Sequence, residues 1–122
     1  MIVVLLAMLM PADRVVAHSK RFPTFVAATW FTDEKLHGVV NALPEPCHTG
    51  RKVVVYRDGS VLGGAVSDAG HWEATLSMGP GDYRVVAPRR RFGRRSHRHV
   101  CERSEYKFNL TQEEFDAPPL WR

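Results

Sequence analysis

Positive charge is concentrated in one short segment of this 122-residue chain. Between residues 89 and 103, seven arginines and the single acid Glu102 give a net charge of +6, against +4 for the whole chain. Guanidinium groups bind phosphates and carboxylates through paired hydrogen bonds, and a cluster of them attracts polyanions. The segment is therefore a candidate polyanion-binding site; the competing interpretation is a solvated loop whose charges favour solubility. Its arginines are Arg89, Arg90, Arg91, Arg94, Arg95, Arg98 and Arg103.

Potential metal ligands lie at the end of the same segment. His97, His99 and Cys101 alternate along the chain, so on a strand they would point to one face, and imidazole with thiolate suits zinc. His48, next to Cys47, would supply a fourth ligand if the two cysteines came together. A disulfide between those cysteines would remove the thiolate, and for that reason we expect no metal site.

A polar trio stands near the middle of the chain. Ser67, Asp68 and His71 are residue types that form nucleophilic triads, but three neighbours in a tight turn more often bond to the backbone. The Gly-x-Ser-x-Gly nucleophile elbow is missing from the sequence, and no carboxylate pair can be singled out for glycoside hydrolysis. We therefore expect no catalytic residues and no cofactor, that is, a protein that is not an enzyme.

The first ten residues carry no charged side chain and are followed by Pro11 and then by Val15, Val16 and Ala17. A short apolar run that ends at small residues is typical of a secretory signal peptide and is too short to span a bilayer. We expect residues 1–17 to be a signal peptide and the protein to be secreted. The alternative is a buried first strand.

The chain has two cysteines, Cys47 and Cys101. In an oxidising compartment an even pair in a small domain usually forms a disulfide, which contributes about 2–4 kcal/mol by restricting the unfolded chain. In a reducing compartment the same thiols would be buried apolar groups or metal ligands. Export therefore predicts a disulfide between Cys47 and Cys101.

Short runs rich in β-branched and aromatic residues alternate with turn residues after the signal. This pattern, without a long amphipathic helix, predicts an all-β sandwich of the immunoglobulin type. About seven strands are expected, at residues 25–31, 36–42, 52–57, 61–66, 71–76, 83–87 and 106–110.

The chain length allows one domain. We expect a β-sandwich over residues 18–112 and a flexible tail over residues 113–122, because Pro118 and Pro119 stop any helical turn that Thr111 begins. After the signal, no apolar stretch approaches the roughly 20 residues of a membrane helix, so the protein is not expected to span a membrane.

Aromatic residues in these runs are candidates for the core. Trp72 shares one strand face with the other apolar residues of its run and would point inward. Tyr83 follows a Pro-Gly-Asp turn, like the tyrosine at the corner of a sandwich whose hydroxyl bonds nearby backbone. Trp30 and Trp121 are the alternatives for a surface site, such as one that stacks on a sugar ring.

Several motifs occur in a characteristic order: Gly38-Val39-Val40, a cysteine before residues 51–57, Gly70-His71-Trp72, Pro80-Gly81-Asp82-Tyr83 and a final His-x-His-x-Cys. This order resembles carboxypeptidase-regulatory-like domains, in particular the small secreted two-cysteine versions of actinobacteria. The resemblance covers roughly residues 25–110 and implies a transthyretin-like (prealbumin-like) sandwich, usually non-catalytic. The family's Thr-Asp-x-x-Gly-x-aromatic turn departs here, with Val66 and Ser67 in its first two places.

These observations predict a secreted, non-enzymatic module with a structural or adhesive role at the cell exterior. The alternative is a polyanion binder that uses the arginine-rich segment, with an anionic cell-surface polymer, an acidic glycan or nucleic acid as partner. Sequence-specific DNA reading is disfavoured because the chain has no recognition-helix pattern and export would separate it from the genome.

Overall fold

The computed structural model describes residues 19–94 and 97–117. The predicted signal peptide, Arg95 and Trp121 lie outside this part of the chain. None of the helices formed by the described residues has the length and apolar character needed to cross a membrane.

The described residues form ten strands, one 3₁₀ turn and one short helix. In chain order they are β1 (Ser19–Phe22), β2 (Phe25–Thr32), β3 (Lys35–Asn41), η2 (Glu45–Cys47), β4 (Lys52–Arg57), β5 (Ser60–Val66), β6 (His71–Thr75), β7 (Gly81–Ala87), β8 (Arg90–Arg94), β9 (His97–Cys101), β10 (Ser104–Leu110) and α2 (Gln112–Asp116).

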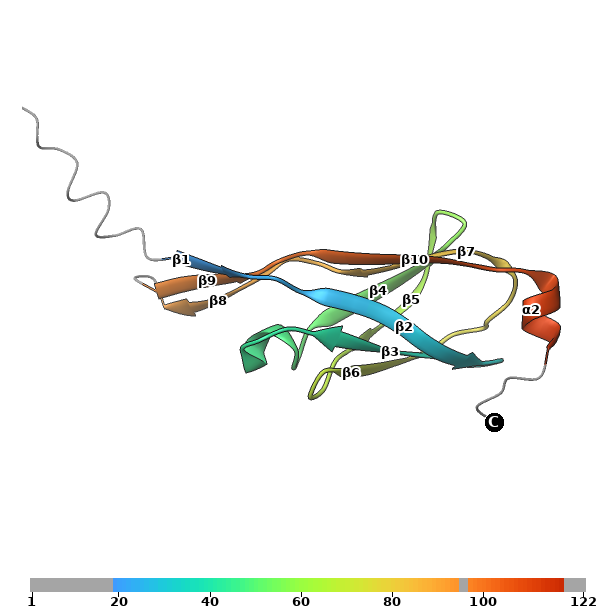
Figure 1. The fold of residues 1–122 in the computed structure, drawn as a ribbon, viewed down its shortest axis with the longest axis horizontal. Helices are drawn as coiled ribbons and strands as arrows, with labels where there is room; N and C mark the ends of the chain where they lie inside the picture. The colour runs from blue at the N-terminus through green and yellow to red at the C-terminus, as the bar shows by residue number, and fades with distance from the viewer. Residues whose placement is uncertain (1–18, 95–96, 118–122) are drawn as a thin grey trace, which may run out of the picture.

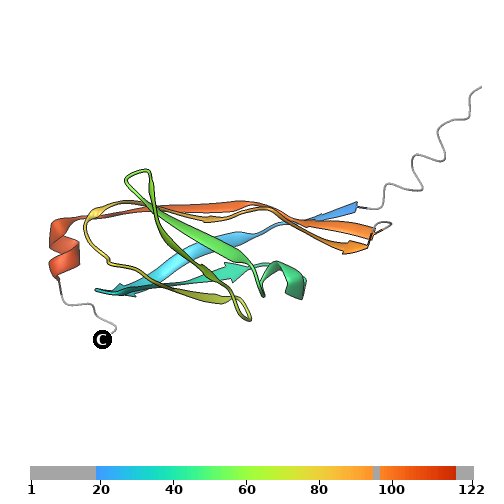
Figure 2. The same ribbon diagram turned by 180° about the vertical axis from the view of Figure 1, so that it is seen from behind.

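Two sheets form a sandwich body, and a third sheet extends from one end of it (Figure 1). The body consists of a β10-β7-β4-β5 sheet packed on a β2-β3-β6 sheet. A turn leads from β5, at the edge of the first sheet, to β6, at the edge of the second (Figure 2). The third sheet, of order β1-β9-β8, is called the arm here. Its strands precede β2, follow β7 and precede β10 in the chain, so the same chain segments run through both parts.

Alternating apolar residues of the body strands meet in one core. Val53 and Val55 of β4 and Val85 of β7 are fully buried, as the period of two along a strand requires. Trp72 is 3% exposed and lies over Gly38, where an added Cβ would stand 2.3 Å from the indole. Only glycine leaves room for the ring at this position, and the prediction that Trp72 is a core residue is confirmed.

Tyr83 closes the turn before β7 as expected. Its hydroxyl donates to the carbonyl of Gly79 and accepts from the amide of the same residue at 3.0 Å. The phenol ring stacks on Phe108 of β10. The corner therefore joins a turn, β7 and β10 through one side chain.

The all-β sandwich is confirmed, and each of the seven predicted strands has a counterpart in the body. The three further strands, β1, β8 and β9, make the arm. Sequence patterns did not reveal them because β8 and β9 are rich in arginine and histidine and lack the apolar alternation of a strand packed on a core.

A short helix follows the last body strand. The Thr111 side chain accepts from the amide of Glu114 and the Glu114 carboxylate accepts from the amide of Thr111, which is a capping box. Phe115 stacks on Phe31 of β2. Residues 113–116 of the predicted flexible tail thus lie in a helix that docks on the body, and residues 118–122 lie outside the described part.

Candidate functional site

The inner face of the arm packs on the 3₁₀ turn η2. Cys101 of β9 is bonded to Cys47 at the end of η2, with 5.4 Å between their Cα atoms and both residues fully buried. Phe22 of β1 and Phe92 of β8 pack around this bond, and the ring of His99 contacts both of them. The predicted disulfide is confirmed, and it joins the arm to the connection between β3 and β4.

Arg51, just before β4, occupies the junction between arm and body. Its side chain is fully buried, and its two terminal nitrogens donate to four oxygen acceptors at 2.9 to 3.1 Å. The acceptors are the Thr24 hydroxyl and the carbonyls of Cys47, Pro88 and Glu102.

Three of these acceptors lie where a body strand gives way to an arm strand. Thr24 lies between β1 and β2, Pro88 between β7 and β8, and Glu102 between β9 and β10. Burial lowers the pKa of the Arg51 guanidinium, and nearby Arg90 adds to the effect, but an arginine keeps its charge in proteins. One buried cation therefore fixes the direction in which all three strands leave the body.

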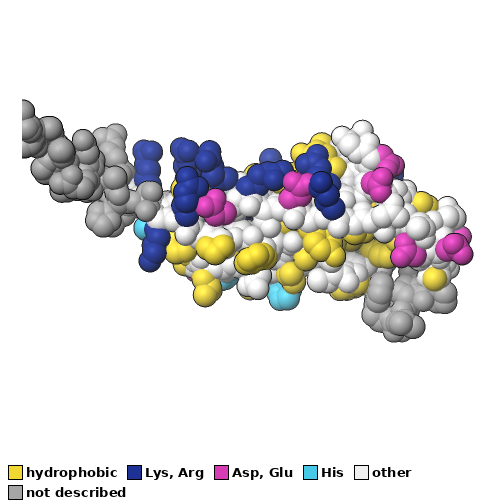
Figure 3. All heavy atoms as spheres, turned by 45° about the horizontal axis from the view of Figure 1, so that its top comes forward, with side chains coloured by type: hydrophobic (Ala, Val, Ile, Leu, Met, Phe, Trp, Pro, Cys, Tyr) yellow, Lys and Arg dark blue, Asp and Glu magenta, His cyan; other side chains and the backbone are white. Residues whose placement is uncertain are grey.

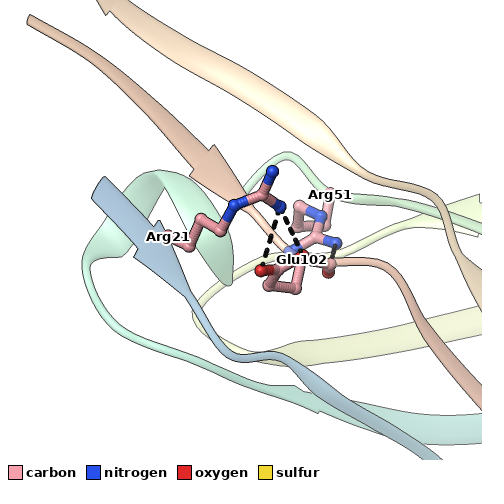
Figure 4. Close-up of polar contacts among 3 residues, drawn as sticks. All are labelled: Arg21, Arg51 and Glu102. Atoms are coloured by element: carbon pink, nitrogen blue, oxygen red, sulfur yellow. Dashed lines mark hydrogen bonds and ion pairs between the residues drawn. The ribbon is translucent and has the colours of Figure 1, made fainter. Parts of the chain in front are cut away.

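Glu102 connects this junction to the outer face of the arm (Figure 4). Its carbonyl accepts from Arg51, and its carboxylate accepts from Arg21 of β1 at 3.2 Å. The amide of Glu102 also donates to the carbonyl of Phe22 at 2.9 Å. The first arm strand is thus held to the end of β9 by backbone and side-chain contacts.

The outer face of the arm is cationic. Cross-strand partners share a face, and Val100 of β9 is paired with Arg21 on one side and Arg91 on the other. Arg98 lies two residues before Val100 and so points to the same face, opposite Gly93. Because neighbouring strands are about 4.8 Å apart, the backbone brings these three arginines together on one face around Val100.

Lys and Arg side chains continue from the arm along the body, with carboxylates between them (Figure 3). On the body, Arg103 and Lys107 both pair with Glu105, at 3.1 and 3.6 Å. The Arg84 guanidinium lies 4.1 Å from the centre of the Tyr56 ring. Among the described residues, Arg91, Arg94 and Arg98 form no ion pair. The charge available to a ligand is therefore greatest on the arm.

The predicted basic residues fall into different environments. Arg91 and Arg98 are exposed on the outer face, Arg94 is exposed near the tip, and Arg89 is exposed in the connection before β8. Arg90 turns inward and donates to the carbonyls of Pro46 and Thr49, so it holds η2 against the arm. Arg103 is paired with Glu105, and Arg95 lies outside the described residues.

The structure also adds Arg21 to the outer face, which no pattern in the sequence indicated. Arg21 belongs to β1, which lies parallel to β9, whereas its neighbour Lys20 pairs with His99 on the inner face. Residues 19–22 carry no apolar alternation, and a parallel partner about eighty residues away leaves no local signal, so no pattern in the sequence could have placed Arg21 there.

The zinc hypothesis that used the Cys101 thiolate is wrong, because Cys101 is oxidised. His48 is also engaged, with its Nδ1 at 2.6 Å from the carbonyl oxygen of Ala42. Within residues 19–94 and 97–117, no three or more His, Cys, Asp and Glu residues gather as metal ligands. The side chain of His97 is not among the described ones.

The polar trio near the middle of the chain is part of a turn. Ser67 is 3% exposed, and its hydroxyl donates to the carbonyl of His48 at 2.8 Å and accepts from the amide of Arg51 at 3.0 Å. The backbones of Asp68 and His71 exchange two hydrogen bonds. Ser67 therefore positions the segment that carries Arg51.

No protein-family model, curated protein or solved structure matches this chain. The resemblance to carboxypeptidase-regulatory-like domains stays a prediction that rests on the order of the motifs.

Proposed function

We propose that this protein is an exported, non-enzymatic binding module whose arm holds polyanions at the cell exterior. The observation that carries the proposal is the outer face of the arm, where Arg21, Arg91 and Arg98 project from three neighbouring strands around Val100. Guanidinium forks match phosphate and carboxylate groups, and a cluster of them raises the local concentration of polyanions.

The attachment of the arm supports this role. A binding surface gains affinity when it is rigid before the ligand arrives, because less conformational entropy is lost on binding. The disulfide and the four hydrogen bonds of Arg51 hold the inner side of the arm, while Arg91 and Arg98 on its outer face are exposed. The disulfide also supports export, since such bonds persist in oxidising compartments.

The structure of the arm suits recognition of negative charge better than recognition of a specific nucleotide sequence. Its cations stand on a sheet, and within the described residues the only α-helix is α2, of five residues at the other end of the body (Figure 1). Contacts from arginines to a phosphate backbone give affinity that depends on salt and little on sequence.

A salt titration tests the proposal. We expect the purified protein to bind poly(glycerol phosphate) and a short DNA duplex at low salt, with affinity falling steeply as salt rises. The double variant R91Q/R98Q should bind at least about tenfold more weakly and reduce the slope of log affinity against log salt by roughly two. The matched control is K35Q/K52Q, which removes the same charge from exposed lysines of the body and should bind like the parent.

Two results would contradict the proposal. One is no binding of either polymer at low salt, which would leave the arm a structural extension. The other is an equal loss of binding in R91Q/R98Q and K35Q/K52Q, which would show that net charge and not the arm attracts the polymer.

A further inference from the structure

A β-bulge turns one tryptophan of the body toward solvent. Along β2, residues pair regularly with β3 until Ala28 faces Gly38, and the next pair is Trp30 with His37, so Thr29 is the extra residue. Because side chains alternate between faces, an unbulged strand would place Trp30 in the core and Thr29 outside. Bulges re-aim side chains in this way and are frequent beside binding sites.

The exposed indole lies flat on a histidine. The rings of Trp30 and His37 are stacked with 3.6 Å between their centroids and 7° between their planes. Trp30 is 38% exposed, although burial of its large apolar surface would favour folding. The Thr29 hydroxyl donates to the carbonyl of His37 at 3.3 Å, which ties the bulge to β3.

This stack forms one wall of a groove of about 550 Å³ on the outer side of the β2-β3-β6 sheet. Gly38, Val39, Asp68 and His71 also line the groove. His71 is exposed, and Glu73 also lines the groove. The groove therefore combines an aromatic ring with hydrogen-bonding side chains in one lining.

The charge of the groove distinguishes it from the arm. Asp68 and Glu73 are its two carboxylates, and it has no Lys or Arg in its lining. Lys35 lies just outside and is already bonded to Glu73 at 2.7 Å. Carboxylates without a free cation repel anionic ligands and accept hydrogen bonds from hydroxyl groups.

We propose that this groove binds a neutral oligosaccharide, with a pyranose ring lying on the Trp30 side chain and its hydroxyl groups bonded to Asp68, His71 and Glu73. The C–H face of a sugar ring is apolar and its edge is rich in hydroxyls, which matches an aromatic plane beside carboxylate and imidazole groups. This site is separate from the arm and takes a different class of ligand, so its proposal does not depend on polyanion binding.

Titration with neutral oligosaccharides tests the groove. Cellohexaose, chitohexaose and maltohexaose are each added to the purified, disulfide-bonded protein and followed by calorimetry and by amide NMR shifts. We expect at least one of them to bind at millimolar concentration or below and to shift the amides of Val39 and His71. W30A should weaken this binding by about tenfold, and H71A by severalfold.

The control variant is F25A, which removes another exposed aromatic side chain from the same strand but outside the groove, and it should bind like the parent. R91Q/R98Q should also bind these sugars unchanged, which separates this site from the arm. The proposal is overturned if none of the three sugars binds at millimolar concentration. It is equally overturned if W30A and H71A, shown to be folded by circular dichroism, bind as tightly as F25A.

Discussion

In the sandwich body, buried apolar side chains from both sheets share one core, which includes Leu36, Val53, Trp72 and Val85. In the arm, the buried apolar cluster is small and consists of the disulfide, Ala42, Phe22 and Phe92. The arm depends instead on hydrogen bonds from Arg51 and Arg90 to backbone carbonyls, although its strands continue those of the body.

The difference follows from how much surface each part can bury. Two facing sheets exclude water from a whole layer of side chains, whereas a single three-stranded sheet has one covered face. A single sheet with an outer face left to solvent needs other contacts, and a covalent bond with charged hydrogen bonds supplies them. The outer face of the arm is therefore free to carry arginines.

Truncation of the core should have the largest effect. We expect W72A to lower the free energy of unfolding by about 3–5 kcal/mol, because it leaves a cavity above Gly38 between the two sheets. Urea denaturation measures the loss, with F25A as the control for an exposed aromatic residue. A loss below about 1 kcal/mol would mean that Trp72 does not support the body as described.

Removal of the disulfide should weaken the arm more than the body. The bond closes a separation of 54 residues, and we expect C47S/C101S to lose about 2–4 kcal/mol of unfolding free energy. Amide hydrogen exchange locates the effect: protection should fall in β8 and β9 and be retained in β4 and β7. An equal loss of protection in the arm and in the body would contradict the inference that the arm depends on the disulfide more than the body does.

Arg51 offers the sharpest test of the junction. In R51M the carbonyls of Pro88 and Glu102 and the hydroxyl of Thr24 lose their donor, and we expect a loss of about 2–3 kcal/mol with the disulfide intact. R51K keeps the charge but cannot bond four acceptors in one plane, so it should recover little of this loss. R91M is the exposed control, and a stability of R51M equal to that of R91M would show that the junction contributes nothing.

The smallest effect is expected at the surface pair of Lys35 and Glu73. The hydrogen bond from Lys35 lowers the pKa of the Glu73 carboxyl below its usual 4.5, and the same bond raises the pKa of Lys35 above 10.5. The pair therefore stabilises the fold between these values. Its contribution is lost as the pH falls through the folded pKa of Glu73 or rises through that of Lys35.

The urea midpoints of E73Q and the parent measure this contribution. The parent should be slightly more stable near neutral pH, and the difference should vanish once the pH falls below the lowered pKa of Glu73. It should also shrink in about 1 M salt, because exposed pairs are screened. A difference that stays constant from neutral to acid pH would show that the charge of Glu73 is not its source.

Local chemistry in the sequence was enough to predict the body. The run before Asp58 is dense in valine, the residues around Trp72 alternate, and Tyr83 follows a Pro-Gly-Asp turn, so each strand or corner has its signal in neighbouring residues. Arg51 has no such signal. An arginine that precedes a lysine and a run of valines is expected to be exposed to solvent, not buried. Arg51 is buried because the tertiary structure brings the acceptors of Thr24, Pro88 and Glu102 together around its guanidinium group.

The candidate sites show the same limit. The arginine-rich segment could be located from composition, but Arg90 turns inward while Arg21 joins the outer face from the other end of the chain. Likewise the sequence gives Trp30 only as one of two alternatives for a surface site, since one extra residue in β2 reverses the side to which its side chain points.

The sequence by itself determined the all-β class, the seven body strands and the cysteine pair, because periodicity, turn residues and residue counts are local properties. Tertiary structure decided which arginines are ligands of the backbone and which face solvent, and on which side of the sheet Trp30 lies. These outcomes depend on strand register and on pairing between distant segments, which place groups within bonding distance without leaving any mark on neighbouring residues.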